Sequence, residues 1–301
     1  TIFKKDNTSQ ILITANSNLT QLAANTTYVL TTDISMNNSF TSVGENVVFD
    51  GSGHTITIKN KINFPGLFPT SVIVKNLGIL SSGTTTLVQY AGWFFAAYIG
   101  GIATNCYSTG AISGSGGGIF GFSSSGIATN CYSTGQLGDY GGGIFGQSSS
   151  GIATNCYSTG GNMTNAAGGI FGTSSPGIAI NCYSTGQFGL NCGGIFGYGS
   201  AGKATNCYST GLLGSNAGGI FGANSTGTQT NCYHAPNGWY DVSANAYLTG
   251  IGSIWTSRPG TTTDIPYMLT ALYSANRIQI IANIPTVLVA NTTYILNADV
   301  T

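Results

Sequence analysis

Eight carboxylates are the first residues of this sequence that could carry out catalysis. Glycoside hydrolysis usually requires two Asp or Glu side chains that face each other about 5–10 Å apart. Asp139 is the only charged residue between Lys75 and Lys203, so the middle of the chain holds no acid/base pair. We therefore predict that the chain is not an enzyme, and a polysaccharide lyase or hydrolase remains as a remote alternative. The eight acids are Asp6, Asp33, Glu45, Asp50, Asp139, Asp241, Asp264 and Asp299.

Metal-ligand patterns are the second kind of chemistry that the residues could support. The chain has seven Cys and two His, but no Cys-x-x-Cys pair, and His54 and His234 do not lie at zinc-ligand spacing. A lyase would also use clustered carboxylates to hold Ca²⁺, and no such cluster is visible in the sequence. Asp50 lies in Phe-Asp-Gly-Ser-Gly, which is typical of a turn. We predict no metal and no cofactor.

Six of the cysteines mark an internal repeat. The tripeptide Asn-Cys-Tyr recurs with spacings of 25, 25, 26, 25 and 25 residues. A second block, Gly-Gly-Ile-Phe-Gly, recurs between the copies, and a divergent copy at 92–96 precedes the set. Each unit is too short to bury its own apolar face, whereas stacked identical units bury a continuous core. The six cysteines are Cys106, Cys131, Cys156, Cys182, Cys207 and Cys232.

The composition of each unit indicates which secondary structure stacks. Short β-prone stretches alternate with Gly/Ser turns, and no stretch has the 3.6-residue apolar period of a helix. We therefore predict an all-β fold, a parallel β-helix with coils of about 25 residues whose neighbours lie about 4.8 Å apart. A slip of one residue would turn inward side chains outward, which explains the nearly constant period.

Alternation along the strands predicts which side chains form the core. Four positions that lie six residues after a Cys are apolar, namely Ile112, Leu137, Phe188 and Leu213, and Leu77 takes the Cys position in an earlier coil. We therefore place Cys inward as a buried, reduced thiol. We expect the Thr two residues before each Cys to face inward as well. Cys192 lies outside this column and is predicted to be a loop thiol. Asn tolerates left-handed backbone and is expected at a turn. The predicted structural ladder contains the six cysteines and Asn105, Asn130, Asn155, Asn181, Asn206 and Asn231.

The same alternation places an aromatic column on the outside. Such a column could contact a glycan or a host receptor, or it could be a self-stacking surface with no ligand. An adhesin that binds through this column is therefore the main alternative function. The column contains Tyr107, Tyr132, Tyr157, Tyr183, Tyr208 and Tyr233.

The motifs resemble a known family of repeats. The segments Gly-Ile-Phe-Gly at 118–121 and Gly-Ile-Ala-Thr-Asn-Cys-Tyr-Ser-Thr-Gly at 126–135 resemble GLUG-motif repeats of bacterial surface proteins, including adhesins and IgA-protease-like passenger regions. The segment 48–58 resembles the opening coils of pectate-lyase-type β-helices, which implies a right-handed coil. The Trp255 … Pro266-Tyr267 segment is similar to the ending that closes such arrays.

A second duplication links the two ends of the sequence. Residues 25–35 read Asn-Thr-Thr-Tyr-Val-Leu-Thr-Thr-Asp-Ile-Ser, and residues 291–301 read Asn-Thr-Thr-Tyr-Ile-Leu-Asn-Ala-Asp-Val-Thr. The sequence thus divides into opening coils at 1–91, repeat coils at 92–235, a capping segment at 236–270 and the start of a second module or a docking segment at 271–301. We expect tandem modules or self-association through 1–35 and 271–301.

Composition restricts the functional class. Only 5% of the 301 residues are charged and the net charge is zero, which argues against a nucleic-acid partner. No apolar run reaches the ~20 residues of a membrane-spanning helix, so we expect no membrane insertion. A neutral rod with few protease sites suits the outside of a cell or particle. We predict a structural module of an extracellular, cell-surface or virion-surface fibre or filament.

Overall fold

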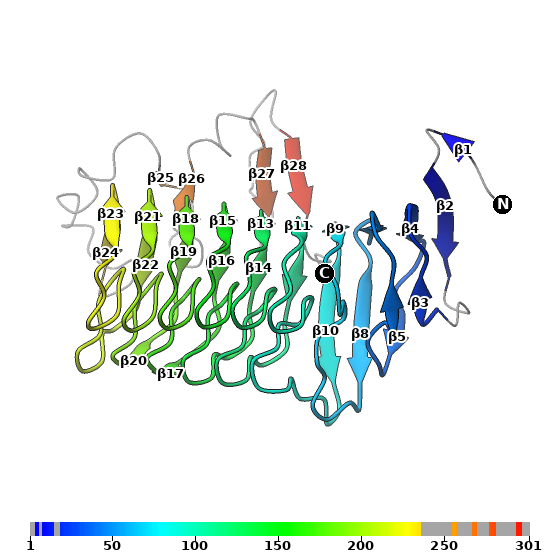
Figure 1. Cartoon of the computed structure of the whole chain (residues 1–301). Coiled ribbons are helices and arrows are strands. Elements are labelled where there is room, and N and C mark those ends of the chain that lie inside the picture. Colours follow the sequence, from blue (N-terminus) through cyan, green and yellow to red (C-terminus); the bar gives the residue numbers. More distant parts are fainter. Residues whose placement is uncertain are drawn as a thin grey trace. The chain divides into compact units, whose positions relative to one another are not determined.

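The computed structural model describes residues 4–5, 8–14, 19–235, 255–257, 267–269, 277–280 and 293–296. The chain forms two compact units, Thr1–Pro236 and Asn237–Thr301. The described elements are all strands, and in the first unit they stack as a parallel β-helix, which confirms the predicted fold class (Figure 1). The described part of the chain holds no helix long and apolar enough to cross a membrane.

One side of the coil is an 11-stranded sheet, here called sheet 1. Its strands pair in parallel, except for the antiparallel pair of β1 and β2 at the first edge. Most of these strands have only three residues, because each coil turns sharply at both ends of the strand. In order, they are β1 (Lys4–Lys5), β2 (Thr8–Ile13), β4 (Thr26–Leu30), β7 (Val48–Asp50), β9 (Ile73–Lys75), β11 (Ile102–Thr104), β13 (Ile127–Thr129), β15 (Ile152–Thr154), β18 (Ile178–Ile180), β21 (Lys203–Thr205) and β23 (Thr228–Thr230).

A second side of the coil is a parallel 9-stranded sheet, sheet 2. It comprises β5 (Ile34–Met36), β8 (Thr55–Lys59), β10 (Gly78–Ser82), β12 (Tyr107–Ser108), β14 (Tyr132–Ser133), β16 (Tyr157–Ser158), β19 (Tyr183–Ser184), β22 (Tyr208–Thr210) and β24 (Tyr233–Ala235). Two short parallel pairs complete the coils: β3 (Gln21–Leu22) with β6 (Ser42–Val43), and β17 (Met163–Asn165) with β20 (Phe188–Leu190).

Equivalent residues of successive coils lie directly opposite one another. Ile127 pairs with Ile152, and Ile152 pairs with Ile178 although that coil has one residue more. The extra residue falls at Gly161–Asn162. Both of these residues are exposed, and pairing resumes at Met163. The insertion therefore loops outward and leaves the register intact, as the two-residue alternation of the strands requires.

Columns of identical side chains fill the repeat coils. The phenylalanines of the Gly-Gly-Ile-Phe-Gly block stack with centroid distances of 4.5–4.9 Å and interplanar angles of 3–6°. This face-to-face arrangement follows from the backbone, because hydrogen-bonded strands fix the spacing of about 4.8 Å between coils. The stacked rings are Phe95, Phe120, Phe145, Phe171, Phe196 and Phe221.

The described residues of the second unit form two strand pairs. Strand β25 (Trp255–Ser257) pairs antiparallel with β26 (Tyr267–Leu269), and β27 (Arg277–Ile280) pairs in parallel with β28 (Thr293–Leu296). In β28, Tyr294 belongs to the duplicated Asn-Thr-Thr-Tyr segment and lies opposite Ile278. In the first unit Tyr28 of the other copy lies opposite Ile11, also in a parallel pair. The duplicated sequences thus form the same kind of strand pair. The division into four segments stays a prediction, and most residues of its last two segments lie outside the described residues.

Candidate functional site

The tyrosine column runs across sheet 2, with one tyrosine at the start of each strand from β12 to β24, and the rings of its first four members stack on one another. Ring centroids of Tyr107, Tyr132, Tyr157 and Tyr183 lie 4.7–4.9 Å apart with interplanar angles of 2–6°. A Cβ on Gly78 would lie 2.4 Å from the Tyr107 ring, so the outer face of that first ring rests against backbone. The faces that would stack on a sugar are therefore covered by protein.

Burial increases along the same column. Tyr107, Tyr132, Tyr157 and Tyr183 are half-buried, Tyr208 is only 6% exposed, and the side chain of Tyr233 lies outside the described residues. Burial raises the pKa of Tyr107, with a smaller contribution from the negative charge of Asp33. Burial, followed by the neighbouring Tyr107, raises the pKa of Tyr132 to about 12. These two phenols are thus neutral at ordinary pH, and a binding role for the column stays a prediction.

The thiol column lies inside the coils. Cys106, Cys131, Cys156, Cys182 and Cys207 are fully buried, and Cys232 in the last coil is partly exposed. Each buried thiol donates to the carbonyl two residues earlier, for example Cys106 Sγ to Thr104 O at 3.3 Å. Burial raises the pKa of the Cys106, Cys156 and Cys182 thiols, so they remain protonated and unreactive. All seven cysteines are free.

Cys192 is also buried, although the sequence suggested a loop thiol. Its carbonyl accepts from Gly218 N at 2.9 Å, and the equivalent carbonyls of Ala167 and Ala91 accept from Gly193 and Gly117. Cys192 therefore takes the place of a small buried residue in a second column. Cys192 lies outside the strands, just after β20, so the loop position is confirmed, but this loop faces the core and buries the thiol.

The asparagine column forms an amide ladder at the turn between the two sheets. Each side chain donates from Nδ2 to Oδ1 of the Asn one coil earlier, over 3.0–3.2 Å, from Asn231 back to Asn76. Every member has left-handed backbone, with φ between 51° and 54°. Asn combines tolerance of this conformation with an amide that both donates and accepts, so it satisfies both requirements of the position. The members are Asn76, Asn105, Asn130, Asn155, Asn181, Asn206 and Asn231.

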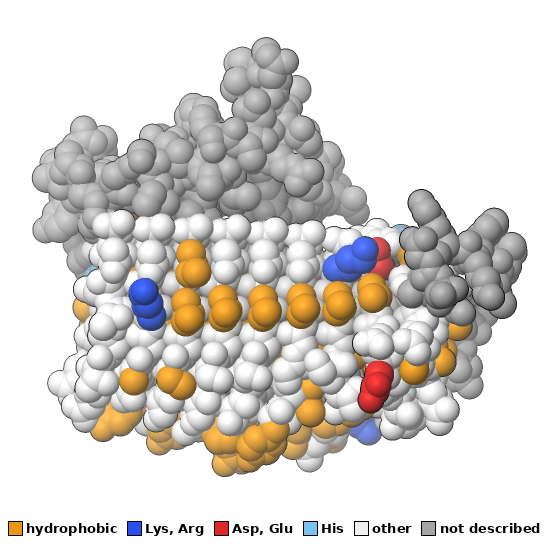
Figure 2. All heavy atoms as spheres, turned by 45° about the horizontal axis from the view of Figure 1, so that its top comes forward, with side chains coloured by type: hydrophobic (Ala, Val, Ile, Leu, Met, Phe, Trp, Pro, Cys, Tyr) orange, Lys and Arg blue, Asp and Glu red, His pale blue; other side chains and the backbone are white. Residues whose placement is uncertain are grey.

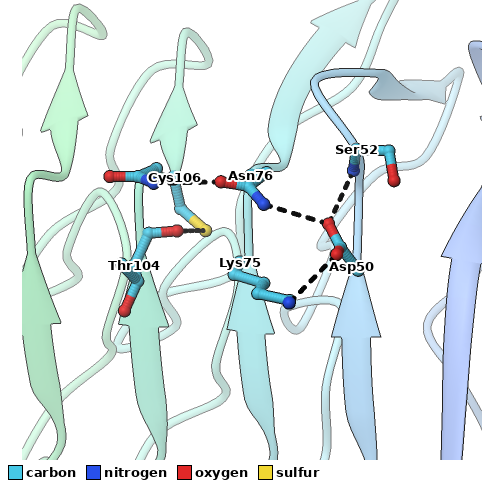
Figure 3. A network of polar contacts seen from close by, with 7 residues as sticks. Asp50, Ser52, Lys75, Asn76, Thr104 and Cys106 are labelled. Carbon is cyan, nitrogen blue, oxygen red and sulfur yellow. Dashed lines mark hydrogen bonds and ion pairs between the residues drawn. The ribbon is translucent and has the colours of Figure 1, made fainter.

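The ladder ends on Asp50, which lies in a network of polar contacts (Figure 3). Asp50 Oδ1 accepts from Asn76 Nδ2 at 3.1 Å and from Ser52 N at 2.8 Å, and Oδ2 lies 3.1 Å from Lys75 Nζ. Burial alone would raise the pKa of Asp50, but these hydrogen bonds and the Lys75 charge outweigh it and lower the pKa. The carboxylate is thus held in its charged form by Ser52 of its own turn and by Lys75 and Asn76 of the next coil.

Two other carboxylates are also bound by nearby groups. Asp33 accepts from Thr55 N at 2.8 Å and lies 3.5 Å from His54 Nδ1, and the Thr55 hydrogen bond chiefly lowers its pKa. Asp139 accepts from the Thr164 hydroxyl. No three His, Cys, Asp or Glu side chains in the described part of the chain converge as a metal site would require. Asp6, Asp241, Asp264 and Asp299 lie outside the described residues.

The threonines of sheet 1 were predicted to face inward, and this prediction was wrong. Ala103 and Ala128 are fully buried, whereas Thr104 and Thr129 are half-buried on the outer face. The Asn between Thr and Cys has left-handed backbone, which interrupts the alternation of inward and outward side chains. The inward direction of Cys therefore does not predict the direction of the Thr two residues before it. Alignment of the alanines with Val74 of the earlier coil would have given the correct face.

Two further columns were missed by sequence reasoning. Ser108, Ser133, Ser158, Ser184 and Ser209 are buried beside the thiols. On the outside of sheet 1, one isoleucine from each coil between β9 and β18 forms a row in which Ile73, Ile102 and Ile127 are 38–42% exposed. Figure 2 shows this row of hydrophobic side chains along one face, with a basic side chain at its end. In the next coil, Lys203 lies opposite Ile178 and takes the position of the isoleucine.

The last coil leaves a hollow of about 500 Å³. Phe221 stacks on Phe196 at 4.9 Å and is partly exposed, while His234 Nδ1 lies 2.8 Å from Ser209 Oγ. Burial lowers the pKa of His234, so its ring is neutral at physiological pH. The hollow is lined by Gly219, Ile220, Phe221, Ser225, Gly227, Gln229, Cys232 and His234.

Comparison with known proteins supports the architecture. No protein-family model matches the chain, and no curated protein matches it. Among solved structures, the chain is similar to a "putative immunoglobulin A1 protease" from Bacteroides ovatus, with 22% identity and a TM-score of 0.51 over 77% of this chain and 83% of that chain. At this identity the likeness shows a shared fold. The resemblance to GLUG-motif repeats stays a prediction.

Proposed function

We propose that this chain is a structural module of a secreted or surface-exposed fibre, in which the β-helix serves as a stiff shaft. The observation that carries the proposal is the unbroken stacking of the repeat coils. The same phenylalanine, tyrosine, cysteine and asparagine positions stack from coil to coil, with ring planes within 2–6° of parallel. The columns extend along the coil axis and resist both bending and local opening.

The charge distribution supports an exterior role. Between Lys75 and Lys203 there is no Lys or Arg, so this span offers no site to trypsin-like proteases. Identical charges stacked about 4.8 Å apart would repel each other, which gives a physical reason for the low charge of a repeat built from identical coils. The similarity to a bacterial protein named for an immunoglobulin A1 protease fits a secreted or surface location.

Electron microscopy and protease treatment test this proposal. We expect antibodies against the chain to label the exterior of intact cells or particles, and the purified chain to show straight rods. Trypsin should leave a core fragment that contains the 76–203 span. Labelling confined to the interior of permeabilised cells, or rapid cleavage of that span by a protease of broad specificity under native conditions, would contradict the proposal.

A further inference from the structure

The edge of the stack at β23 has hydrogen-bonding groups directed away from the coils. Thr228 N donates back to Gly202 O at 3.0 Å, and Thr230 O accepts from Asn206 N at 2.9 Å, so both residues face the preceding coil. Backbone groups of alternate residues in a parallel strand point to opposite sides. Gln229 therefore directs its N–H and C=O to the other side, where no described strand pairs with β23.

The core columns are also exposed at this edge. Phe145, Phe171 and Phe196 are fully buried, but Phe221 is partly exposed because, among the described residues, only one of its faces has a stacked ring. The partly exposed Cys232 ends the thiol column in the same way. The hollow of about 500 Å³ lies against both side chains. Among the described coils, this edge thus offers an apolar cross-section and a strand with one unpaired side, which together are a template for one more coil.

The chain also contains a strand pair of the type that this edge would accept. Strands β27 and β28 repeat the parallel pairing of β2 and β4, and their second strands share the Asn-Thr-Thr-Tyr segment. In the first unit that pair already belongs to sheet 1, the sheet that β23 ends. The outer edge of β2 is covered by β1 (Lys4–Lys5), and lysines on an edge strand oppose further pairing. No described strand covers the outer edge of β27.

We propose that β27 and β28 of one molecule add to the free edge of β23 in a second copy of this chain, as further parallel coils of sheet 1. The inference rests on the proposed role of the β-helix as a shaft, and it names the partner of that shaft. The contact joins different surfaces of the two copies, so repetition produces an open filament rather than a closed dimer. Main-chain hydrogen bonds supply affinity, as in other cases of strand addition.

Substitution of Gln229 tests the acceptor edge in the full chain. Gln229→Pro removes one N–H from the free side and leaves the hydrogen bonds of Thr228 and Thr230 to the preceding coil in place. Gln229→Ala is the matched control, because it shortens the same side chain but keeps the N–H. Sedimentation velocity over a 100-fold concentration range should show association for the wild type and the alanine variant, weakened at least tenfold in the proline variant.

A peptide of residues 275–301 tests the donor pair. In excess, it should occupy the β23 edge and shorten the assemblies, whereas a scrambled peptide should leave their length unchanged. A wild-type chain that stays monomeric, a proline variant that assembles like the wild type, or a peptide without effect would each overturn the inference. If the chain is monomeric and the proline substitution increases its hydrodynamic radius, the β23 edge binds β27 and β28 of the same chain. That result would also overturn the inference. Monomers that are straight rods leave the structural role standing, whereas particles that are not rods contradict both proposals.

Discussion

The opening coils and the repeat coils enclose the same kind of interior in different ways. Between residues 19 and 91, large side chains of several types interlock, and Phe68 contacts Phe40 and Phe49 at interplanar angles of 27° and 67°. Between residues 102 and 210, identical rings stack within 6° of parallel. The opening coils depend on mutual fit among different side chains, and the repeat coils depend on the spacing of the backbone.

This difference determines how each region can respond to damage. In the opening coils, neighbours at varied angles can move into a vacant space. In the repeat coils the hydrogen-bonded strands hold each ring at its own level, so a vacancy between two rings cannot close. A short repeated sequence therefore specifies the whole repeat core, but each side chain in that core tolerates little change in volume.

The largest expected effect distinguishes the two cores directly. Phe145→Ala should lower the free energy of unfolding by about 5 kcal/mol, and Phe68→Ala by about 3 kcal/mol, the upper and lower ends of the usual range for buried phenylalanine. Both side chains are fully buried, so the difference reports how far each site can collapse. Urea denaturation of both variants measures it. Equal losses, or a larger loss for Phe68→Ala, would contradict the comparison.

Glycines beside the phenylalanine column should be the next most sensitive positions. A Cβ on Gly126 would lie 2.2 Å from Cε1 of Phe120, a ring held between Phe95 and Phe145. Gly126→Ala should therefore cost about 1–3 kcal/mol through overpacking. Gly161→Ala is the control, since its Cβ would meet nothing within 4 Å. Thermal unfolding should shift downward only for the first variant, and a shift of equal size in the second would refute the explanation.

The asparagine ladder should contribute less per residue. Asn155→Gly keeps the left-handed backbone but removes the amide that links Asn130 to Asn181. Asn155→Ala loses the amide and also places a Cβ in an unfavourable conformation, which costs about 1–2 kcal/mol more. We expect alanine to be the more damaging change by that amount in chemical denaturation. If glycine proves as damaging as alanine, the hydrogen bonds rather than the backbone conformation dominate at this turn.

Alkaline pH should reveal the smallest contribution, from the tyrosine column. The folded pKa of Tyr132 is raised to about 12, above the value of about 10 in unfolded chains. Its contribution to stability is therefore complete below pH 10 and is lost as the pH rises toward 12. Denaturation midpoints measured from pH 8 to pH 12 should fall over that interval. The double variant Tyr132→Phe and Tyr157→Phe should lose less stability there than the wild type does, and an unchanged pH dependence would refute the assignment.

Much of this architecture follows from spacing along the chain. A 25-residue period with fixed Cys, Asn and Phe positions can be satisfied only if equivalent residues stack, so the all-β coil and the buried thiols follow from the sequence. The duplicated Asn-Thr-Thr-Tyr segments likewise indicated a repeated strand pair. These features are local or periodic, and the sequence by itself determined them.

Other features were decided only by the tertiary structure. Thr104 lies outside because left-handed Asn105 interrupts the alternation. The tyrosine ring faces are covered because backbone pairing brings successive rings within 5 Å of each other. Likewise, the hollow beside Phe221 depends on where the stack of described coils ends. Such properties arise from contacts between coils and from turns that redirect the chain, and the composition of a single coil contains neither.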